Sequence, residues 1–148
     1  MRLVIGSDHA GWPLKQAVID HIRSLGHEVV DVGSHDEKPV DFPDIARAVA
    51  KKVTSGEVAR GIMVCGTGVG ASIAANKMKG IRAAVCHDVH SAHQCVEHDD
   101  VNVMCIGAQI VGPWLARDLI AAYLGATFST AEEFRRRVAK LAIMDDER

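Results

Sequence analysis

Residues 61–77 of the chain read GIMVCGTGVGASIAANK. An apolar run ends at Cys65, and three glycines then alternate with small residues before a segment that suits a helix. A glycine-alternating turn between a strand and a helix commonly lets backbone N–H groups close on an anion. The stretch therefore predicts a strand, a turn and a helix, with a binding site at the turn.

The same alternation of a short apolar run and a helical pattern recurs along the chain. Pro13 and Pro43 suit the first turns of helices, whereas Gly26 and Gly56 suit helix ends. Five apolar runs are typical of strands buried on both faces: residues 3–6, 28–32, 61–65, 83–86 and 103–107. This order predicts an α/β fold in which helices cover both faces of a five-stranded parallel sheet.

A last helical pattern, residues 131–144, has no strand after it, so this C-terminal helix must pack on the sheet or on another subunit. In an open α/β sheet, ligands bind beyond the carboxyl ends of the strands. Function is therefore expected just after each strand, at residues 7–9, 66–70, 87–88 and 107–109.

Length and composition suit a single domain, residues 1–148, that buries about 70% of its unfolded surface. Lys and Arg number 17 and Asp and Glu number 19, which gives no general electrostatic reason to expect nucleic acid or a membrane as partner. No apolar run approaches the roughly 18–20 residues that span a bilayer, which predicts a cytoplasmic protein. The four cysteines form no CxxC pair, so reduced thiols are expected.

Three interpretations of the glycine-rich turn are open from the residues alone. Gly66, Gly68 and Ala71 satisfy the dinucleotide pattern G-x-G-x-x-A, with Asp88 near the end of the next apolar run. That match is weak, because the turn follows the third strand rather than the first and no separate substrate domain is present. The second interpretation is a plain tight turn. In the third, Cys65 stands beside free N–H groups and acts as a base or nucleophile rather than as a small apolar residue.

The stretch HDVHSAHQCVEHDD offers a second set of candidates. His90 and His93 lie three apart in a helical pattern and could share a metal with Asp99 or Asp100. No HExxH or CxxC pattern accompanies them, so no metal is expected. His98, at the end of the helical pattern, is a candidate general acid.

Asp8 and His9 follow the first strand directly. This pair suits sugar hydroxyls or a phosphate, and the simpler alternative is an aspartate that only caps the next helix. Near the C-terminus, Arg135, Arg136 and Arg137 occupy different faces of a helix, so at least one should turn inward or toward a partner.

Taken together, these motifs resemble a known family. SDHAGWPLK, VDFPD, GIMVCGTGVGASIAANK, GIRAAVC, EHDDVNV and IGAQIVG, in this order and spacing, resemble ribose-5-phosphate isomerase B and the related galactose-6-phosphate isomerase subunits. The resemblance spans nearly the whole chain. It implies an aldose–ketose isomerase of three-layer α/β/α, Rossmann-like form that needs neither metal nor cofactor and acts through an enediolate. It also implies a homodimer or dimer of dimers with active sites between subunits.

The resemblance implies roles for individual residues. Cys65 matches the base that moves a proton between C1 and C2, and His98 of the neighbouring subunit matches the residue that opens the sugar ring with help from Thr67. Asp8 matches a residue that holds substrate hydroxyls, and His9 matches a phosphate contact. The loop whose backbone N–H groups hold the enediolate oxygens comprises Gly66, Thr67, Gly68, Val69 and Gly70.

The chain departs from the family pattern mainly at the substrate end. The departing residues are Phe42 for a tyrosine, Asp99 for an asparagine, Gln109 for a phosphate-binding arginine, and Glu133 and Phe134 for an arginine and a histidine. Arg137 keeps its place, and Asp99, Gln109 and Arg137 are expected to line the substrate. Lost charge-assisted contacts, each contributing about 1.5–3 kcal/mol, predict weaker phosphate binding.

The substrate therefore stays open. Conversion of ribose 5-phosphate to ribulose 5-phosphate, a step of the pentose phosphate pathway, is the family default, and another phosphorylated sugar or a sugar with no phosphate is the alternative. A sugar- or nucleotide-binding module without turnover is the alternative from a different class. The presence of Cys65, Thr67 and His98 together disfavours it, because a binding module needs neither an acid nor a base.

Overall fold

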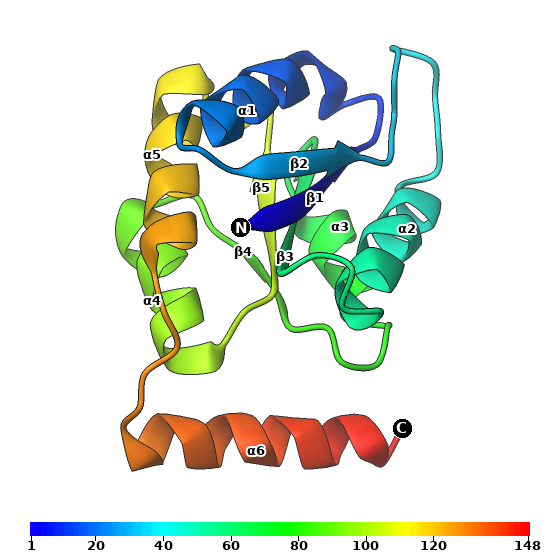
Figure 1. The fold of residues 1–148 in the computed structure, drawn as a ribbon. Coiled ribbons are helices and arrows are strands. Elements are labelled where there is room, and N and C mark those ends of the chain that lie inside the picture. The colour runs from blue at the N-terminus through cyan, green and yellow to red at the C-terminus, as the bar shows by residue number, and fades with distance from the viewer.

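The five predicted strands form one parallel sheet in the computed structural model, which describes residues 1–148 (Figure 1). The strands are β1 (Arg2–Ser7), β2 (Glu28–Asp31), β3 (Arg60–Cys65), β4 (Ala83–Val85) and β5 (Val103–Gly107). Each predicted range is correct to within one residue at either end. The strands follow the order β2-β1-β3-β5-β4, so β3 lies at the centre and the predicted α/β class is confirmed.

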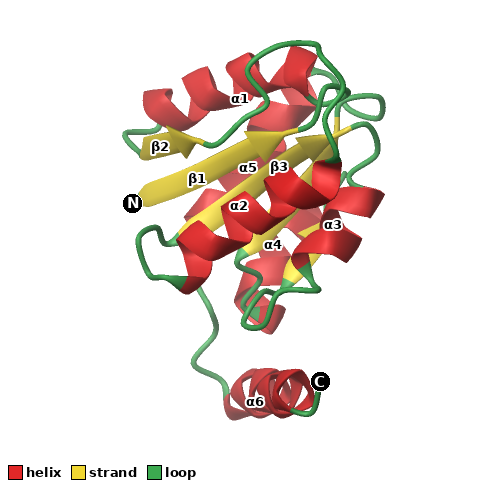
Figure 2. Cartoon of the chain, turned by 90° about the vertical axis from the view of Figure 1, so that its right-hand side faces the viewer, coloured by secondary structure: helices red, strands yellow, loops and turns green.

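Helices cover both faces of the sheet (Figures 1 and 2). One face carries α1 (Trp12–Ser24), α4 (Val89–Asp99) and α5 (Pro113–Gly125), and the other carries α2 (Phe42–Thr54) and α3 (Val69–Ala75). Pro13 and Pro43 stand in the first turns of α1 and α2, as predicted. Gly26 and Gly56 follow the ends of these helices with φ of +83° and +75°, angles that favour glycine. None of the helices has both the length and the apolar character needed to cross a membrane.

Successive side chains of the central strand point to opposite faces of the sheet. In β3, Ile62 and Val64 belong to the core beneath α1, α4 and α5, whereas Met63 and Cys65 belong to the core beneath α2 and α3. All four side chains are buried. This period of two is what a strand between two helical layers requires, and it directs Cys65 toward the side of α2 and α3.

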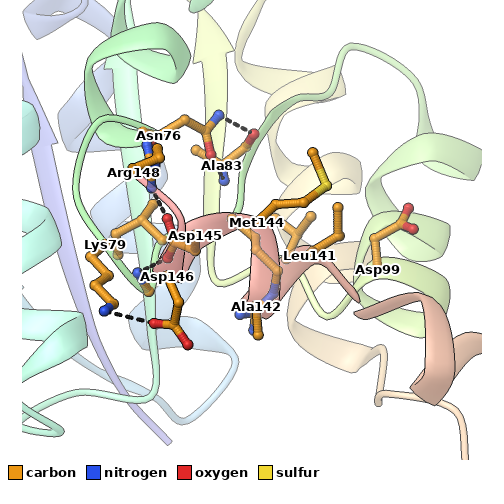
Figure 3. A pocket seen from close by; sticks show the side chains of 14 residues that line it. Asn76, Lys79, Ala83, Asp99, Leu141, Ala142, Met144, Asp145, Asp146 and Arg148 are labelled. Carbon is orange, nitrogen blue, oxygen red and sulfur yellow. Dashed lines mark hydrogen bonds and ion pairs between the residues drawn. The ribbon is translucent and has the colours of Figure 1, made fainter. Parts of the chain in front are cut away.

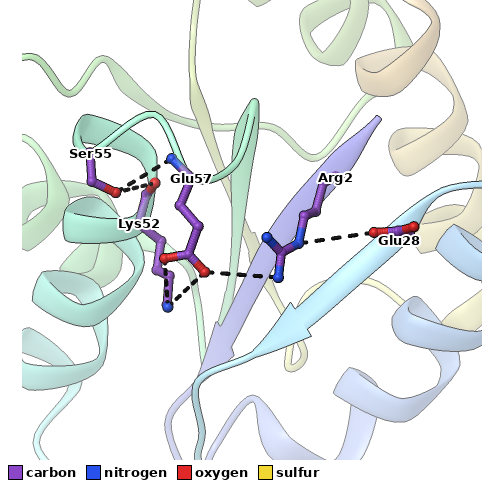
Figure 4. A network of polar contacts seen from close by, with 5 residues as sticks. All are labelled: Arg2, Glu28, Lys52, Ser55 and Glu57. Atoms are coloured by element: carbon purple, nitrogen blue, oxygen red, sulfur yellow. Dashed lines mark hydrogen bonds and ion pairs between the residues drawn. The ribbon is translucent and has the colours of Figure 1, made fainter.

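Exposed ion pairs connect the starts of β1 and β2 to the segment after α2 (Figure 4). Lys52 Nζ donates to Glu57 at 2.8 Å, and the Arg2 guanidinium lies 3.9 Å from Glu57 and 4.0 Å from Glu28. The hydrogen bond from Lys52 is the main cause that lowers the pKa of Glu57. Because pairs this exposed contribute little to stability, apolar burial rather than this network holds the layers together.

The C-terminal helix α6 (Glu132–Asp146) lies apart from the sheet, below the other helices in Figure 1. None of its residues is buried, and its contacts within the chain are with the end of α4 and with the segment before β4. The apolar side chains of Leu141, Ile143 and Met144 are exposed. The helix does not pack on the sheet of its own chain, so contact with another subunit stays a prediction.

Candidate active site

Cys65 and Asp8 lie side by side at the carboxyl edge of the sheet. The Cys65 thiol donates to Asp8 Oδ2 at 3.3 Å, and the Gly11 N–H donates to Asp8 Oδ1 at 2.8 Å. Both side chains are buried, with 7% and 5% of their surfaces exposed. The sequence did not predict this contact. In the structure Ser7 pairs with Val64 on the neighbouring strand, so the next residues of the two strands, Asp8 and Cys65, lie side by side.

The glycine-rich loop from Gly66 to Gly70 is held against the end of β5. The Ala108 N–H donates to the Cys65 carbonyl at 2.8 Å, and the Gln109 N–H donates to the Gly66 carbonyl at 3.0 Å. At Gly107, a Cβ would lie 2.7 Å from Thr67 Cα, so only glycine permits this close approach. Gly68 has φ of +81° and begins α3 in the left-handed region.

Backbone donors of this loop are free. The N–H groups of Gly66, Thr67 and Gly68 make no hydrogen bond within the chain, whereas the Val69 N–H lies 3.3 Å from Thr67 Oγ1. Free N–H groups next to a buried thiol are able to bind an oxyanion. The structure therefore places unused backbone donors beside the Cys65 thiol.

Gln109 and Phe42 border this loop, and His9 follows Asp8. Amide atoms of Gln109 lie 3.2–3.4 Å from where a Cβ on Gly66 would stand, and the Phe42 ring lies 2.8–3.2 Å from the corresponding point on Gly70. His9 is exposed, and its Nδ1 accepts from the Val40 N–H at 3.2 Å. We call the whole group the cysteine cluster; its members are Asp8, His9, Phe42, Cys65, the loop from Gly66 to Gly70, and Gln109.

A second group of predicted residues lies at the opposite edge of the sheet. The imidazole of His98 stacks on the Phe134 ring of α6, with centroids 4.0 Å apart and planes at 14°, and the Arg137 guanidinium lies 5.6 Å from the centre of the same ring. Asp99, beside His98, is exposed. We call this group, His98, Asp99, Phe134 and Arg137, the histidine cluster.

Chain direction explains why the two clusters are apart. Cys65 ends a strand, whereas α4 begins after the carboxyl end of β4 and runs back, so that His98 reaches the amino edge. The ion pair of Asp100 with Arg82, at 2.7 Å, fixes this end of α4 beside the start of β4. Within one chain the structure therefore does not bring His98, Asp99 or Arg137 to Cys65.

The remaining candidates have structural partners. His93 Nε2 lies 3.2 Å from Glu97 Oε2, and no three His, Cys, Asp or Glu side chains are grouped closely enough to hold a metal ion. Asp88 accepts from the Ser91 N–H at 2.7 Å and caps α4; this hydrogen bond lowers its pKa. Because β5 lies between β3 and β4, Asp88 is not on the strand next to the glycine-rich loop, as a dinucleotide site would require.

A cavity of about 680 Å³ lies not at Cys65 but between α6 and the segment before β4 (Figure 3). Four of its charged residues are paired with each other, Lys79 with Asp146 at 2.6 Å and Arg148 with Asp145. Asp99 is the one predicted site residue that lines it. The cavity lies where α6 stands apart from the sheet, and neither Cys65 nor His98 lines it.

Comparisons with known proteins assign the family. A family model described as Ribose/Galactose Isomerase matches residues 3–141. The chain is 42% identical over 142 residues to ribose-5-phosphate isomerase B of Escherichia coli, with 96% of this chain and 95% of the relative covered. It also matches a structure of ribose-5-phosphate isomerase B from Clostridium thermocellum, with a TM-score of 0.96 and 44% identity over 99% of each chain. The chain belongs to the ribose/galactose isomerase family, which confirms the resemblance.

The protein is therefore an enzyme, an aldose–ketose sugar isomerase of the intramolecular oxidoreductase class. The same comparisons leave the sugar open. The chain is 40% identical over 131 residues to a D-erythrulose-4-phosphate isomerase of Pectobacterium atrosepticum, with 86% of this chain and 85% of the relative covered. Relatives named for a five-carbon and a four-carbon sugar are thus almost equally similar to it.

Proposed function

We propose that the protein interconverts the aldose and ketose forms of a phosphorylated sugar through an enediolate, without a cofactor. Ribose 5-phosphate and ribulose 5-phosphate are the pair that the family implies, and a four-carbon sugar phosphate is the alternative that a relative suggests. The observation that carries the proposal is the Cys65 thiol beside the free N–H groups of Gly66, Thr67 and Gly68.

In this proposal Cys65 is the base. Its thiol proton already has an acceptor, the Asp8 carboxylate at 3.3 Å, and the resulting thiolate takes the proton from C2 of the open-chain aldose. The electron pair of the broken C–H bond forms the enediolate, whose oxygens accept from the free N–H groups of the loop. Return of the proton to C1, together with transfer of the hydroxyl proton from O2 to O1, gives the ketose and restores the thiolate.

Ring opening requires a second copy of the chain. His98, assisted by Thr67, is the proposed acid and base for the ring oxygen and the anomeric hydroxyl. The support is geometric: the cysteine and histidine clusters lie at opposite edges of one chain, so a site that contains both needs two chains. A homodimer, or a dimer of dimers, with active sites between subunits meets this requirement.

The phosphate end of the site is the part that differs from the family pattern. His9 and the positively charged Arg137 remain as contacts for a phosphate. Gln109 and Glu133 supply hydrogen-bond acceptors and no positive charge. We expect ribose 5-phosphate to be a poor substrate, with a Michaelis constant above about 1 mM, the upper end of the usual range.

Turnover in D₂O of tetrose, pentose and hexose phosphates, compared with the same sugars without phosphate at fixed ionic strength, tests the proposal. Deuterium should enter the product from solvent, with no nicotinamide absorbance change. If no sugar exchanges, the proposed chemistry is wrong. Efficient turnover of ribose 5-phosphate that is lost in Arg137→Ala, but not in the exposed control Arg136→Ala, would show that the remaining cations suffice. Preference for an unphosphorylated sugar would mean that Gln109 and Glu133 bind sugar hydroxyls where the family pattern has a phosphate.

A further inference from the structure

The imidazole of His98, the proposed ring-opening residue, is oriented by a ring stack and not by a hydrogen bond. Neither of its ring nitrogens has a hydrogen-bond partner in the chain, whereas His9 and His87 accept from backbone N–H groups at 3.2 and 2.9 Å. The contact that orients the His98 imidazole is its stack on Phe134, with ring centroids 4.0 Å apart and planes at 14°.

We propose that Phe134 is a positioning residue for ring opening: it fixes the plane of the His98 imidazole and does not itself touch the sugar. The inference rests on the proposed role of His98 as the acid and base of that step. It assigns a purpose to a residue that departs from the family pattern and that has no acid, base or phosphate-binding chemistry.

Stacking suits this purpose better than a hydrogen bond does. A hydrogen bond would occupy one ring nitrogen, but proton transfer at the ring oxygen and the anomeric hydroxyl uses nitrogens at the edge of the imidazole. A parallel aromatic ring restricts rotation of the imidazole and leaves that edge free. Without the stack, the half-buried imidazole would sample other orientations, and the fraction of time in the reactive one would fall.

Phe134 has a second neighbour that the test must separate. The Arg137 guanidinium also lies over the Phe134 ring, 5.6 Å from its centre. A substitution that acted through Arg137 would weaken binding of any phosphorylated sugar. A substitution that acts through His98 impairs only reactions that need a ring to open or close.

Four variants distinguish these effects. Phe134→Leu removes the flat face but keeps an apolar side chain, Phe134→Tyr keeps the face, and His98→Ala is the reference for complete loss. The matched control is Phe128→Leu, because Phe128 is another half-buried phenylalanine under an arginine, with Arg135 4.8 Å from its ring centre, and its ring does not stack on the His98 imidazole.

Two reactions of one sugar pair serve as kinetic probes. Ribose 5-phosphate closes into a five-membered ring through O4, so its isomerisation includes ring opening. Ribulose 5-phosphate cannot close such a ring because O5 carries the phosphate, so exchange of its C1 hydrogen with D₂O requires Cys65 and the loop but no ring chemistry. We expect Phe134→Leu to lower the ratio of isomerisation to exchange about tenfold, in the direction of His98→Ala, while Phe134→Tyr and Phe128→Leu leave it unchanged.

The stack itself is checked by NMR. The imidazole C–H signals of His98, identified by their loss in His98→Ala, should be shifted by the Phe134 ring current and should move to the position of the exposed His90 signals in Phe134→Leu. Unshifted signals in the wild type would overturn the proposal. So would a stack lost in Phe134→Leu with an unchanged ratio, or equal losses in both reactions. If His98→Ala leaves the ratio unchanged, the proposed role of His98 is wrong instead.

Discussion

The cysteine cluster and the histidine cluster differ in the contacts that hold their residues in place. In the first, backbone groups dominate: strand ends meet, Gly107 packs on Thr67, and buried Cys65 and Asp8 hydrogen-bond to each other. In the second, half-buried and exposed side chains of two helices meet through ring stacking, and no hydrogen bond holds His98. The proposed base is therefore fixed by buried backbone and side-chain contacts, whereas the proposed ring-opening residue is held by a ring stack alone.

This difference explains where the chain can diverge from its family. Asp99, Glu133 and Phe134 project from helix surfaces, where a new side chain displaces no backbone. Phe42 and Gln109 border the glycine-rich loop with their side chains. Substitutions at the substrate end thus need not disturb the proposed base or the proposed oxyanion site.

The largest expected effect is at Cys65. Cys65→Ala should lower turnover by about 10²–10⁴-fold without unfolding the protein, because it removes the proposed base and only a small buried group. Turnover on the best sugar of the panel and the melting temperature are the measurements. A small alkylating reagent should inactivate the wild type, and bound sugar should protect it.

Cys105→Ala is the matched control. Cys105 belongs to the same core, and burial raises the pKa of its thiol, so it is not available as a base. This variant should lose stability and keep turnover. Near-normal turnover in Cys65→Ala would remove the cysteine cluster from the chemistry altogether.

Combining the two clusters in one site is tested by subunit mixing. Cys65→Ala and His98→Ala homodimers are each expected to be impaired, but a heterodimer of the two chains contains one intact site if the clusters come from different chains. Random assembly should restore about a quarter of the wild-type sites, since half of the dimers are mixed. Co-refolded variants would be assayed with ribose 5-phosphate, with each variant refolded alone as control. If proven heterodimers recover no turnover, the two clusters do not form a shared site between chains.

Rigidity of the oxyanion loop is tested at Gly107. In Gly107→Ala the new methyl would lie 2.7 Å from Thr67 Cα and 2.8 Å from the Gly66 carbonyl oxygen, so backbone has to move. We expect a stability loss of about 1–3 kcal/mol and a turnover loss of about 10²-fold, as for a displacement of about 1 Å. Gly125→Ala is the control, because a Cβ there meets nothing within 4 Å. Unchanged turnover in Gly107→Ala would show that the loop adapts.

Sequence patterns predicted the fold well, because its determinants are local. Apolar runs bounded by Pro13, Gly26, Pro43 and Gly56 mark where helices begin and end, and burial on both faces gives strands without polar alternation. The position of α6 away from the sheet was not determined by its pattern. The apolar stripe of α6 is weak, so the sequence of the helix does not specify the surface on which it packs. That surface depends on tertiary or quaternary contacts.

The residues of the candidate site were proposed from the sequence, whereas their contacts came from the structure. The resemblance indicated Cys65, Asp8 and His98, and adjacent strand ends would have suggested the hydrogen bond of Cys65 with Asp8. The stack of His98 on Phe134 joins two helices that are separated along the chain by β5 and α5, so no spacing rule anticipates it. Contacts between side chains on separate elements depend on packing, which a single sequence does not express.

The smallest effect concerns the helix that carries His98. Asp88 caps α4 through the Ser91 N–H, and this hydrogen bond lowers the pKa of its carboxyl. A pKa lowered by folding means that the ionised carboxylate stabilises the folded state. The contribution is therefore complete above about pH 4, the ordinary pKa of an aspartate, and is lost as the pH falls through the lowered value.

Asp88→Asn isolates this contribution, since asparagine caps helices about as well as aspartate but does not titrate. Melting temperatures from pH 7 to pH 3 should show a small advantage of the wild type over Asp88→Asn at neutral pH, because the negative charge also favours the helix N-terminus. The advantage should disappear in acid. Asp88→Ala, which lacks the cap at every pH, should be less stable than both at neutral pH. A difference between wild type and Asp88→Asn that grows in acid would contradict the assigned role of the carboxylate. The end of α4 that carries His98 would then depend on the ion pair of Asp100 with Arg82 alone.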